Sequence, residues 1–319
     1  MNFSTKDGNA TGSVNLRDTL VTAVGKTMTV VVLGVTIVYI NATMVHTFNQ
    51  HHIFYLNPRY ILLIHLALND MIQLTTSISL FILTYAFQSI YTSLCVLLVL
   101  PAIVTTHNTP LNLAFMAAEC YVSVCIPLRY NDICTVKRTH VIIGIIWAIS
   151  SLSVLPDVFI MLATEPPAFL HSRVFCQRDR VFRSSYSMKK RDASHALFLV
   201  VVWIVLFYTY FRILFAAKAA NADAKKARNT ILLHGLQVLS TMMVYVQPMF
   251  IQFLVYLFPG GITSIHFVTF IIYQILPRCA SSIIYGLRDV TFRKHFKRYL
   301  VCAVTVNIIR PENTLKIDS

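Results

Sequence analysis

Charged residues are scarce in this chain, in which 13% of the 319 residues are charged and 56% are hydrophobic. Soluble globular proteins carry about 25% charged residues, so the composition excludes a soluble globule. Glycine (9 residues) and proline (11 residues) are also few, which excludes collagen-like and linker-rich chains. A largely disordered chain is excluded as well, because it needs many charges to stay unpacked. The composition therefore predicts an all-α membrane protein made of long apolar helices.

Acidic residues are the rarer charged kind, with 13 Asp and Glu against 27 Lys and Arg, a formal net charge of +14. In a soluble protein this excess would suggest binding to nucleic acid, but here the basic residues lie mostly between apolar runs. We therefore expect membrane lipid and an acidic cytosolic partner, and no nucleic acid. The sequence also lacks a Walker-type loop, a dinucleotide fingerprint, an HExxH motif and paired CxxC motifs. We expect no enzyme activity, no cofactor and no metal.

Seven runs of mostly apolar residues are each long enough to cross roughly 30 Å of hydrocarbon as a helix. They cover residues 27–45, 60–86, 91–125, 140–163, 194–217, 230–257 and 263–286. An odd number of spans puts the two termini on opposite sides of the membrane. With the N-terminus outside, sixteen basic residues lie in cytosolic segments and ten lie outside, as the positive-inside rule requires. The sequence predicts a seven-transmembrane helix bundle with an extracellular N-terminus.

The first residues are polar and contain two acceptor triplets for N-glycosylation, which begin at Asn2 and Asn9. Both triplets are usable only if the N-terminus is lumenal, in agreement with the distribution of basic residues. No cleavable signal peptide is visible, so we expect the first span to direct insertion. We divide the chain into a glycosylated extracellular N-terminus (1–26), the seven-helix bundle (27–287) and a cytoplasmic amphipathic helix with its tail (288–319).

The C-terminal segment alternates aromatic and basic residues in a helical pattern. The apolar positions are Phe292, Phe296, Tyr299 and Leu300, and the basic ones are Arg293, Lys294, Lys297 and Arg298. This pattern predicts a short amphipathic helix that lies on the inner leaflet of the membrane. Cys302 follows it and is a candidate for palmitoylation.

Three motifs carry a resemblance to one family of receptors. Residues 116–130 read M-A-A-E-C-Y-V-S-V-C-I-P-L-R-Y, residues 226–230 read K-A-R-N-T and precede His234, and residues 277–289 read P-R-C-A-S-S-I-I-Y-G-L-R-D. In this order and spacing they resemble the M-A-x-D-R-Y, K-A-F-S-T and P-M-L-N-P-I-I-Y signatures of odorant receptors. These are a branch of the rhodopsin-like G-protein-coupled receptors, and the resemblance covers almost the whole chain.

Two departures from the family pattern concern activation. Cys120 stands where the family has the arginine of D-R-Y, and Ser281-Ser282 stands where it has N-P. The first change removes a guanidinium that normally pairs with its acidic neighbour, and the second removes a proline that kinks the helix. These variants resemble the fish-type branch of odorant receptors. Following the family, we place six residues on the activation and G-protein side of the bundle: Asp70, Glu119, Cys120, Tyr121, Tyr208 and Tyr285.

The resemblance also implies one disulfide bond. Cys95 and Cys176 are the only two of the seven cysteines that we expect on the extracellular side, where thiols are oxidised. The family joins the outer end of the third span to the following outer loop, and these two cysteines occupy those elements. The resemblance therefore implies a Cys95–Cys176 bond that ties the loop over the mouth of the bundle.

Counting along the spans from these motifs predicts a small-molecule pocket in the extracellular half of the bundle. Its predicted lining is Ile103, Thr106 and His107 on the third span, Met242, Tyr245 and Met249 on the sixth, and Ile271 and Gln274 on the seventh. Alanine at position 102 argues against amines, because an amine receptor needs a carboxylate there. Two alternatives stay open: the methionines pack in the core, and His107 forms a hydrogen bond between helices.

Ionisable residues inside the spans are costly and therefore mark function by default. Asp70 either meets water, a cation or a proton, or it is a packing group satisfied by Asn41 and a water molecule. Arg278 needs an acceptor, which is Asp70, a helix carbonyl or an anionic ligand. The basic residues of the outer loop at 164–192 either attract anionic odorants or are simply solvated.

The resemblance implies an odorant receptor of the plasma membrane, located in the cilia of olfactory neurons. It would bind a small-molecule odorant within the bundle and activate a stimulatory, olfactory-type heterotrimeric G protein. The alternative is a rhodopsin-like receptor for a non-odorant small molecule. A duplicated transporter is disfavoured because no internal repeat is visible. An opsin is disfavoured because no lysine occurs between Lys226 and Lys294, where the family's Schiff-base lysine would lie.

Overall fold

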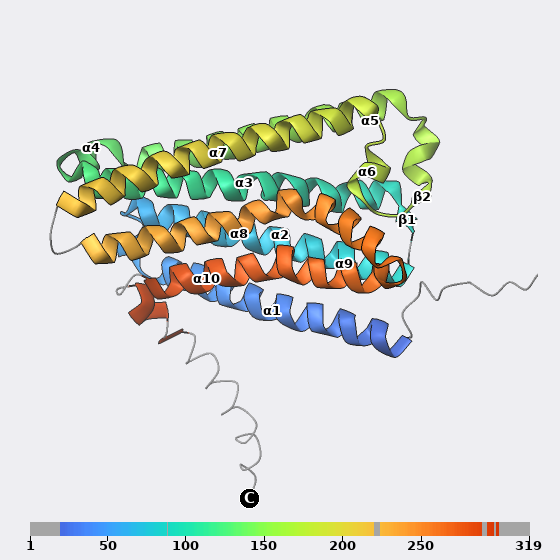
Figure 1. The fold of residues 1–319 in the computed structure, drawn as a ribbon, viewed down its shortest axis with the longest axis horizontal. Helices are drawn as coiled ribbons and strands as arrows, with labels where there is room; N and C mark the ends of the chain where they lie inside the picture. The colour runs from blue at the N-terminus through green and yellow to red at the C-terminus, as the bar shows by residue number, and fades with distance from the viewer. Residues whose placement is uncertain (1–19, 88, 220–223, 289–291, 297, 300–319) are drawn as a thin grey trace, which may run out of the picture.

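Seven helical segments run side by side through the computed structural model, which describes residues 20–87, 89–219, 224–288, 292–296 and 298–299 (Figure 1). They are α1 (Leu20–Gln50), α2 (Pro58–Phe87), α3 (Thr92–Cys125), α5 (Val136–Thr164), α7 (Ser185–Ala219), α8 (Ala224–Leu257) and a last segment. The last segment joins α9 (Ile262–Phe270), a π-helical turn (Ile271–Ile275) and α10 (Leu276–Arg288). The segments coincide with the seven predicted apolar runs, with α3 beginning one residue later than its run, so the seven-helix bundle is confirmed.

The helices expose apolar side chains outward, as a membrane protein requires. Within the described residues, six segments are long and apolar enough to cross a membrane, and α8 contributes a shorter apolar run at Val246–Leu257. Leu97, Phe159 and Ile204 are among the large apolar side chains on the outer surface. Helices dominate because hydrocarbon offers no partner for backbone N–H and C=O groups, which must therefore be satisfied within each segment.

The π-helical turn of the seventh segment has a local cause. It ends two residues before Pro277, whose ring nitrogen cannot donate a hydrogen bond to the carbonyl of Tyr273. A helix commonly adjusts to such a gap by a π-bulge. The turn contains Ile271 and Gln274, both predicted pocket residues. The irregular backbone therefore lies at the predicted ligand site.

Short elements close the two ends of the bundle. At one end, β1 (Ile90–Tyr91) pairs antiparallel with β2 (Arg173–Val174), with α6 (Arg178–Val181) and a 3-10 turn (Pro167–His171) beside them. At the other end lie α4 (Tyr130–Ile133) and the 3-10 turns His52–Phe54 and Pro127–Arg129. Figure 1 shows β1, β2 and α6 at the end opposite α4. The former end carries the predicted outer loop and the latter the predicted cytosolic connections.

The predicted amphipathic C-terminal helix places its aromatic residues against protein. Residues 292–296 are helical, and both Phe292 and Phe296 are buried. The Phe292 ring lies 5.3 Å from the ring of Phe54 and 6.0 Å from that of Tyr60, measured between centroids. Sequence analysis placed this helix on the inner leaflet, and in the structure both phenylalanines belong to an apolar cluster with Phe54, in the 3-10 turn before α2. Leu300 and Cys302 lie outside the described residues, as do Asn2 and Asn9.

Candidate ligand site and activation residues

The extracellular mouth of the bundle is closed by a covalent bond and a backbone pairing. Cys95, in the first turn of α3, forms a disulfide with Cys176 of the outer loop, with 5.5 Å between their Cα atoms. Nearby, the amide of Thr92 donates a hydrogen bond to the carbonyl of Ser172 at 3.0 Å. The predicted disulfide is confirmed, and it fixes the loop to α3 above the interior of the bundle.

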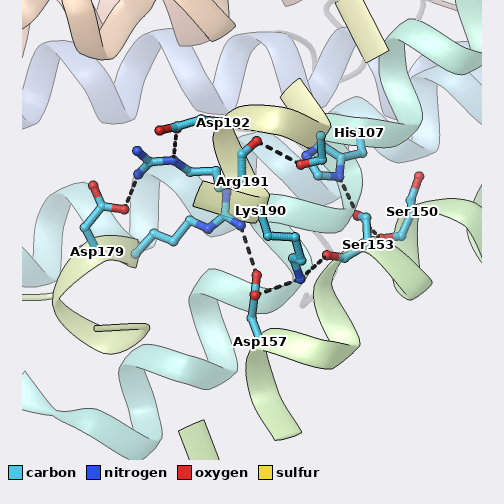
Figure 2. Close-up of polar contacts among 10 residues, drawn as sticks. His107, Ser150, Ser153, Asp157, Asp179, Lys190, Arg191 and Asp192 are labelled. Carbon is cyan, nitrogen blue, oxygen red and sulfur yellow. Dashed lines mark hydrogen bonds and ion pairs between the residues drawn. The ribbon is translucent and has the colours of Figure 1, made fainter. Parts of the chain in front are cut away.

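A buried carboxylate in α5 anchors the same loop from the other side (Figure 2). Asp157 has no exposed side-chain surface, and its Oδ2 accepts a hydrogen bond from Arg178 of α6 at 3.1 Å. Its Oδ1 lies 2.7 Å from Nζ of Lys190 in α7. Burial lowers the pKa of the Arg178 guanidinium, an effect that the bond to Asp157 opposes. The two cations therefore compensate a carboxylate that would otherwise be very costly to bury.

The neighbouring charges of the loop are also paired. Arg191 forms ion pairs with Asp179 and Asp192. Together with the Asp157 pairs, three basic side chains thus form ion pairs with three acidic ones (Figure 2). The basic residues are Arg178, Lys190 and Arg191, and the acidic ones are Asp157, Asp179 and Asp192. Arg183 and Arg173 lie over the rings of Phe169 and Tyr91. Sequence analysis left open whether these basic residues attract anionic odorants or are simply solvated, and much of their positive charge is engaged within the protein.

His107 lies where α3, α5 and α7 meet, and its side chain is buried. Its Nδ1 is 2.8 Å from Oγ of Ser153 in α5, and its ring stacks on Phe198 of α7 with 5.1 Å between centroids. The carbonyl of Ser153 accepts a hydrogen bond from Lys190 at 2.9 Å. The hydrogen bond between helices that was left open for His107 is thus present. Through Ser153, the histidine is two contacts away from the charged network under the loop (Figure 2).

Amides and hydroxyls join α2 to α3 at the same depth. Gln73 donates a hydrogen bond from Nε2 to Oγ1 of Thr106 at 2.6 Å. One turn deeper, Asn69 donates from Nδ2 to Oγ1 of Thr109 at 2.8 Å. The amide of Asn108 in turn donates to Oδ1 of Asn69 at 3.1 Å. Thr106, a predicted pocket residue, therefore faces the interior beside a chain of amides that fixes the register of α2 against α3.

The π-helical turn connects the predicted pocket to the buried charges. Gln274 donates from Nε2 to Oε1 of Gln247 in α8 at 3.4 Å. The backbone carbonyl of Gln274 accepts a hydrogen bond from Arg278. Arg278 also interacts electrostatically with Asp70 of α2, and both side chains are almost completely buried. A helix carbonyl, one of the three acceptors considered for Arg278, is therefore present in the carbonyl of Gln274.

The remaining predicted pocket residues differ in their positions. Ile103 and Ile271 are half-buried and pack against apolar clusters of the outer half of the bundle and of α1, α2 and the π-helical turn. Met242 is buried in an apolar cluster with Leu113, which matches its alternative role in packing. Met249 is 73% exposed, so it lies on the outer surface of α8. The side chain of Tyr245 lies outside the described part of the structure.

The predicted activation residues gather at the cytosolic end, except Asp70, which lies deeper in the bundle. Glu119 is buried, and Cys120 beside it is half-buried. The rings of Tyr121 in α3 and Tyr208 in α7 are 6.1 Å apart, measured between centroids. The side chain of Tyr285 lies outside the described part of the structure.

Sequence analysis missed Asp157 at the extracellular mouth. An acidic residue inside the apolar run 140–163 was a sufficient signal for it, as the same kind of signal was for Asp70.

Comparison with known proteins agrees with this architecture. Residues 40–291 match the seven-transmembrane receptors of the rhodopsin family. Odorant receptor 131-2 of Danio rerio is 31% identical over 309 residues, which are 93% of this chain and 93% of that receptor. Melatonin receptor type 1A-A of Danio rerio is 23% identical over 223 residues, which are 64% of this chain and 59% of that receptor.

The chain belongs to the rhodopsin family of seven-transmembrane receptors. Its resemblance to the fish-type odorant receptors is confirmed by the near full-length match to a receptor of that kind. This membership and the bundle of membrane-spanning helices support a multi-pass protein located in the plasma membrane.

Proposed function

We propose that this receptor binds a small odorant in the extracellular half of the bundle and activates a stimulatory, olfactory-type heterotrimeric G protein. The observation that carries the proposal is the position of His107, Thr106 and Gln274. All three lie inside the bundle and have hydrogen-bonding groups, beneath a loop that the Cys95–Cys176 bond holds over them. An apolar site with a few oriented polar groups is the usual composition of a small-molecule pocket.

The charges of the interior favour uncharged or anionic polar odorants over amines. Among the described residues, the buried carboxylates are Asp70, Glu119 and Asp157, and each interacts with an arginine. An ammonium group entering the bundle would have to compete with those arginines for its counter-charge, at a high desolvation cost. A polar ligand without a positive charge that forms hydrogen bonds with His107, Thr106 or Gln274 meets no such competition.

Activation follows from differential binding to two states of the bundle. A ligand shifts a conformational equilibrium only if it binds one state more tightly than the other. Contact with Gln274 acts on the π-helical turn, whose next polar neighbours are Gln247 in α8 and Arg278. Since Arg278 interacts with Asp70, the contact also reaches α2. A ligand that repositions this turn thereby changes how α8 and the seventh segment pack toward the cytosolic end.

The outer parts of the chain complete the proposal. The N-terminus, residues 1–26, is extracellular and glycosylated at Asn2 and Asn9, and the basic cytosolic residues contact anionic lipid headgroups as well as the G protein. Residues 27–287 form the bundle, and residues 288–319 form the cytoplasmic helix and tail. The competing function, a receptor for a non-odorant small molecule, uses the same bundle and differs only in the ligand and the tissue.

The direct test is a cyclic-AMP reporter in cells that express the receptor with an olfactory-type stimulatory G protein. The challenge panel contains pooled amino acids, bile acids, nucleotides, amines and neutral volatiles. We expect a response from a non-amine pool that His107→Ala and Gln274→Ala abolish at unchanged surface expression. Met249→Ala is the matched control, because that side chain faces outward. Silence of a well-expressed receptor toward every pool would contradict the odorant proposal and favour the non-odorant receptor.

A further inference from the structure

Glu119 needs a counter-charge at the cytosolic end of α3, because its side chain is only 7% exposed. A carboxylate removed from water is strongly destabilising unless it is paired and hydrogen-bonded. The next residue, an arginine in the receptors that this chain resembles, is Cys120. A thiol supplies neither a positive charge nor a strong donor. The sequence of α3 alone therefore leaves Glu119 without the partner that the family pattern provides.

The structure supplies a guanidinium from another helix. Arg59 of α2 donates from Nε to Oε2 of Glu119 at 3.2 Å and from Nη2 to Oε1 at 3.1 Å. Two parallel N–H···O bonds of this kind form the bidentate geometry that is strongest for an arginine and a carboxylate. Nη2 also donates to Oγ of Ser123, one turn along α3, at 3.2 Å. Arg59 thus contacts two residues, Glu119 and Ser123, that lie one turn apart on the same face of α3.

The start of α2 holds Arg59 in place. Asn57 precedes the helix and accepts a hydrogen bond from the amide of Arg59 with its side-chain oxygen at 3.1 Å, as an N-cap residue does. Pro58 occupies the first helical position, where its missing N–H costs nothing. An arginine in the first turn is unfavourable for the helix dipole, and the pair with Glu119 offsets this cost.

A third side chain closes the cluster from the second cytosolic loop. Tyr130, in the first turn of α4, donates from its hydroxyl to Oε1 of Glu119 at 2.8 Å. Burial and the Glu119 carboxylate both raise the pKa of the Tyr130 phenol. The phenol is therefore protonated at neutral pH and donates to Glu119. One carboxylate thus joins α2, α3 and α4.

We infer that Arg59 replaces the missing arginine of α3, and that Arg59, Glu119 and Tyr130 form a cytosolic latch that holds α2, α3 and α4 together in the resting receptor. The inference rests on the proposed function, since a latch regulates only a receptor that signals at its cytosolic end. In this receptor the ion pair of Glu119 joins α2 to α3, whereas an arginine at position 120 would form that pair within α3. Removing one partner leaves a buried charge uncompensated and so favours the open arrangement.

The test compares purified receptor variants in detergent, without any G protein. Arg59→Gln removes the guanidinium, Glu119→Gln removes the carboxylate, and the third variant carries both changes. We expect each single change to lower the melting temperature by roughly 2–4 °C. The double change should cost little more than one of them, because residues in direct contact are not additive. Hydrogen exchange of residues 130–133 should become at least about fivefold faster in Arg59→Gln, since α4 loses its anchor.

A rescue variant separates a latch from general destabilisation. Adding Cys120→Arg to Arg59→Gln returns a guanidinium beside Glu119, and we expect it to restore slow exchange at residues 130–133. Arg59→Lys keeps the charge but loses the bidentate fork. Exchange at residues 130–133 should therefore be slower than in Arg59→Gln but faster than in the native receptor. Lys137→Gln is the control for lost positive charge, because Lys137 is exposed at the start of α5. It should leave both the melting temperature and the exchange unchanged.

Additive losses of melting temperature, or exchange at 130–133 that Arg59→Gln does not change, would overturn the latch. Basal cyclic AMP per surface receptor gives the link to signalling, and we expect Arg59→Gln to raise it at least about fivefold. Unchanged basal cyclic AMP in a receptor that still responds to its ligand would overturn the regulatory role. A receptor silent toward every ligand pool contradicts the proposed function instead, while exchange and melting still decide the latch.

Discussion

Lys190 of α7 lies 2.7 Å from the carboxylate of Asp157 in α5, a side chain with no exposed surface. Arg178 of the outer loop binds the second oxygen of the same carboxylate at 3.1 Å. One acidic residue therefore joins two helices and the loop at the extracellular mouth, where Cys95 and Cys176 make the covalent connection to α3. The loop that covers the proposed ligand site is thus held from both sides.

Asp157→Asn should destabilise the receptor strongly. The change leaves two partly buried cations without their counter-charge, and breaking a buried ion pair by removal of one partner costs about 3–5 kcal/mol. We expect a marked loss of surface expression and a lower melting temperature of the purified protein. Asp192→Asn is the control, because that side chain is 68% exposed and its pair with Arg191 is worth at most about 1 kcal/mol. Equal stability of the two variants would contradict the anchoring role of Asp157.

Ser153→Ala should weaken ligand response without strongly affecting the fold. The Ser153 hydroxyl lies 2.8 Å from Nδ1 of His107 and orients the imidazole between α5 and α7. A single neutral hydrogen bond contributes about 0.5–1.5 kcal/mol, so we expect roughly a two- to tenfold loss of ligand potency in the cyclic-AMP assay. Among the described residues, the Ser79 hydroxyl bonds to a carbonyl of its own helix, that of Thr75, so Ser79→Ala should leave potency unchanged. Equal potencies of the two variants would show that His107 does not depend on Ser153.

The seven spans could be predicted from the sequence, because hydropathy is a local property of each run. The pairing of distant charges could not. Arg59 and Glu119 are 60 residues apart, and Arg178 and Asp157 are 21 apart, so each pair depends on how helices and loops are placed in space. Only the final positions of α2, α3, α5 and α6 show that these groups meet.

The faces of the helices were also difficult to predict. In a soluble helix an apolar stripe marks the buried face, but lipid is as apolar as a protein core, so both faces of a membrane helix look alike in sequence. Met249 was therefore expected inside and lies on the outer surface. Ile103, Thr106, His107, Ile271 and Gln274 lie in the interior because counting from a nearby motif accumulates little rotational error.

Acidic pH should loosen the C-terminal helix through His295. The rings of His295 and His51 are 4.0 Å apart, and the positive charges of Lys294 and Arg298 also act on His295. Burial is the main cause that lowers the pKa of His295 below its unfolded value, and repulsion from His51 is the second. The unfolded segment then binds protons more readily, so this contribution to stability is present above the unfolded pKa and declines as the pH falls through the folded pKa.

The measurement for His295 is hydrogen exchange of residues 292–296 between pH 7.5 and pH 5.5, corrected for the intrinsic pH dependence of exchange. We expect protection to fall at the lower pH in the native receptor. His295→Gln removes the titrating group and should make protection independent of pH in this range. A pH dependence that survives in His295→Gln would place the titration elsewhere, since His46 and Tyr299 lie near the same cluster.

Asp70 and Arg278 should show strong coupling in a double-mutant cycle. Both side chains are almost completely buried in the membrane-spanning part, and they interact electrostatically. Asp70→Asn leaves a buried guanidinium, and Arg278→Gln leaves a buried carboxylate. Each single change should therefore lower the melting temperature, because it leaves the opposite buried charge less compensated. The combined variant contains two neutral amides in place of the two charges, so its melting temperature should lie above that of either single variant. Because Arg278 also binds the carbonyl of Gln274, the combined variant should remain folded yet lose part of its ligand response. Strictly additive losses of stability would mean that the two charges are compensated by other groups, and that the π-helical turn is not connected to α2 through them.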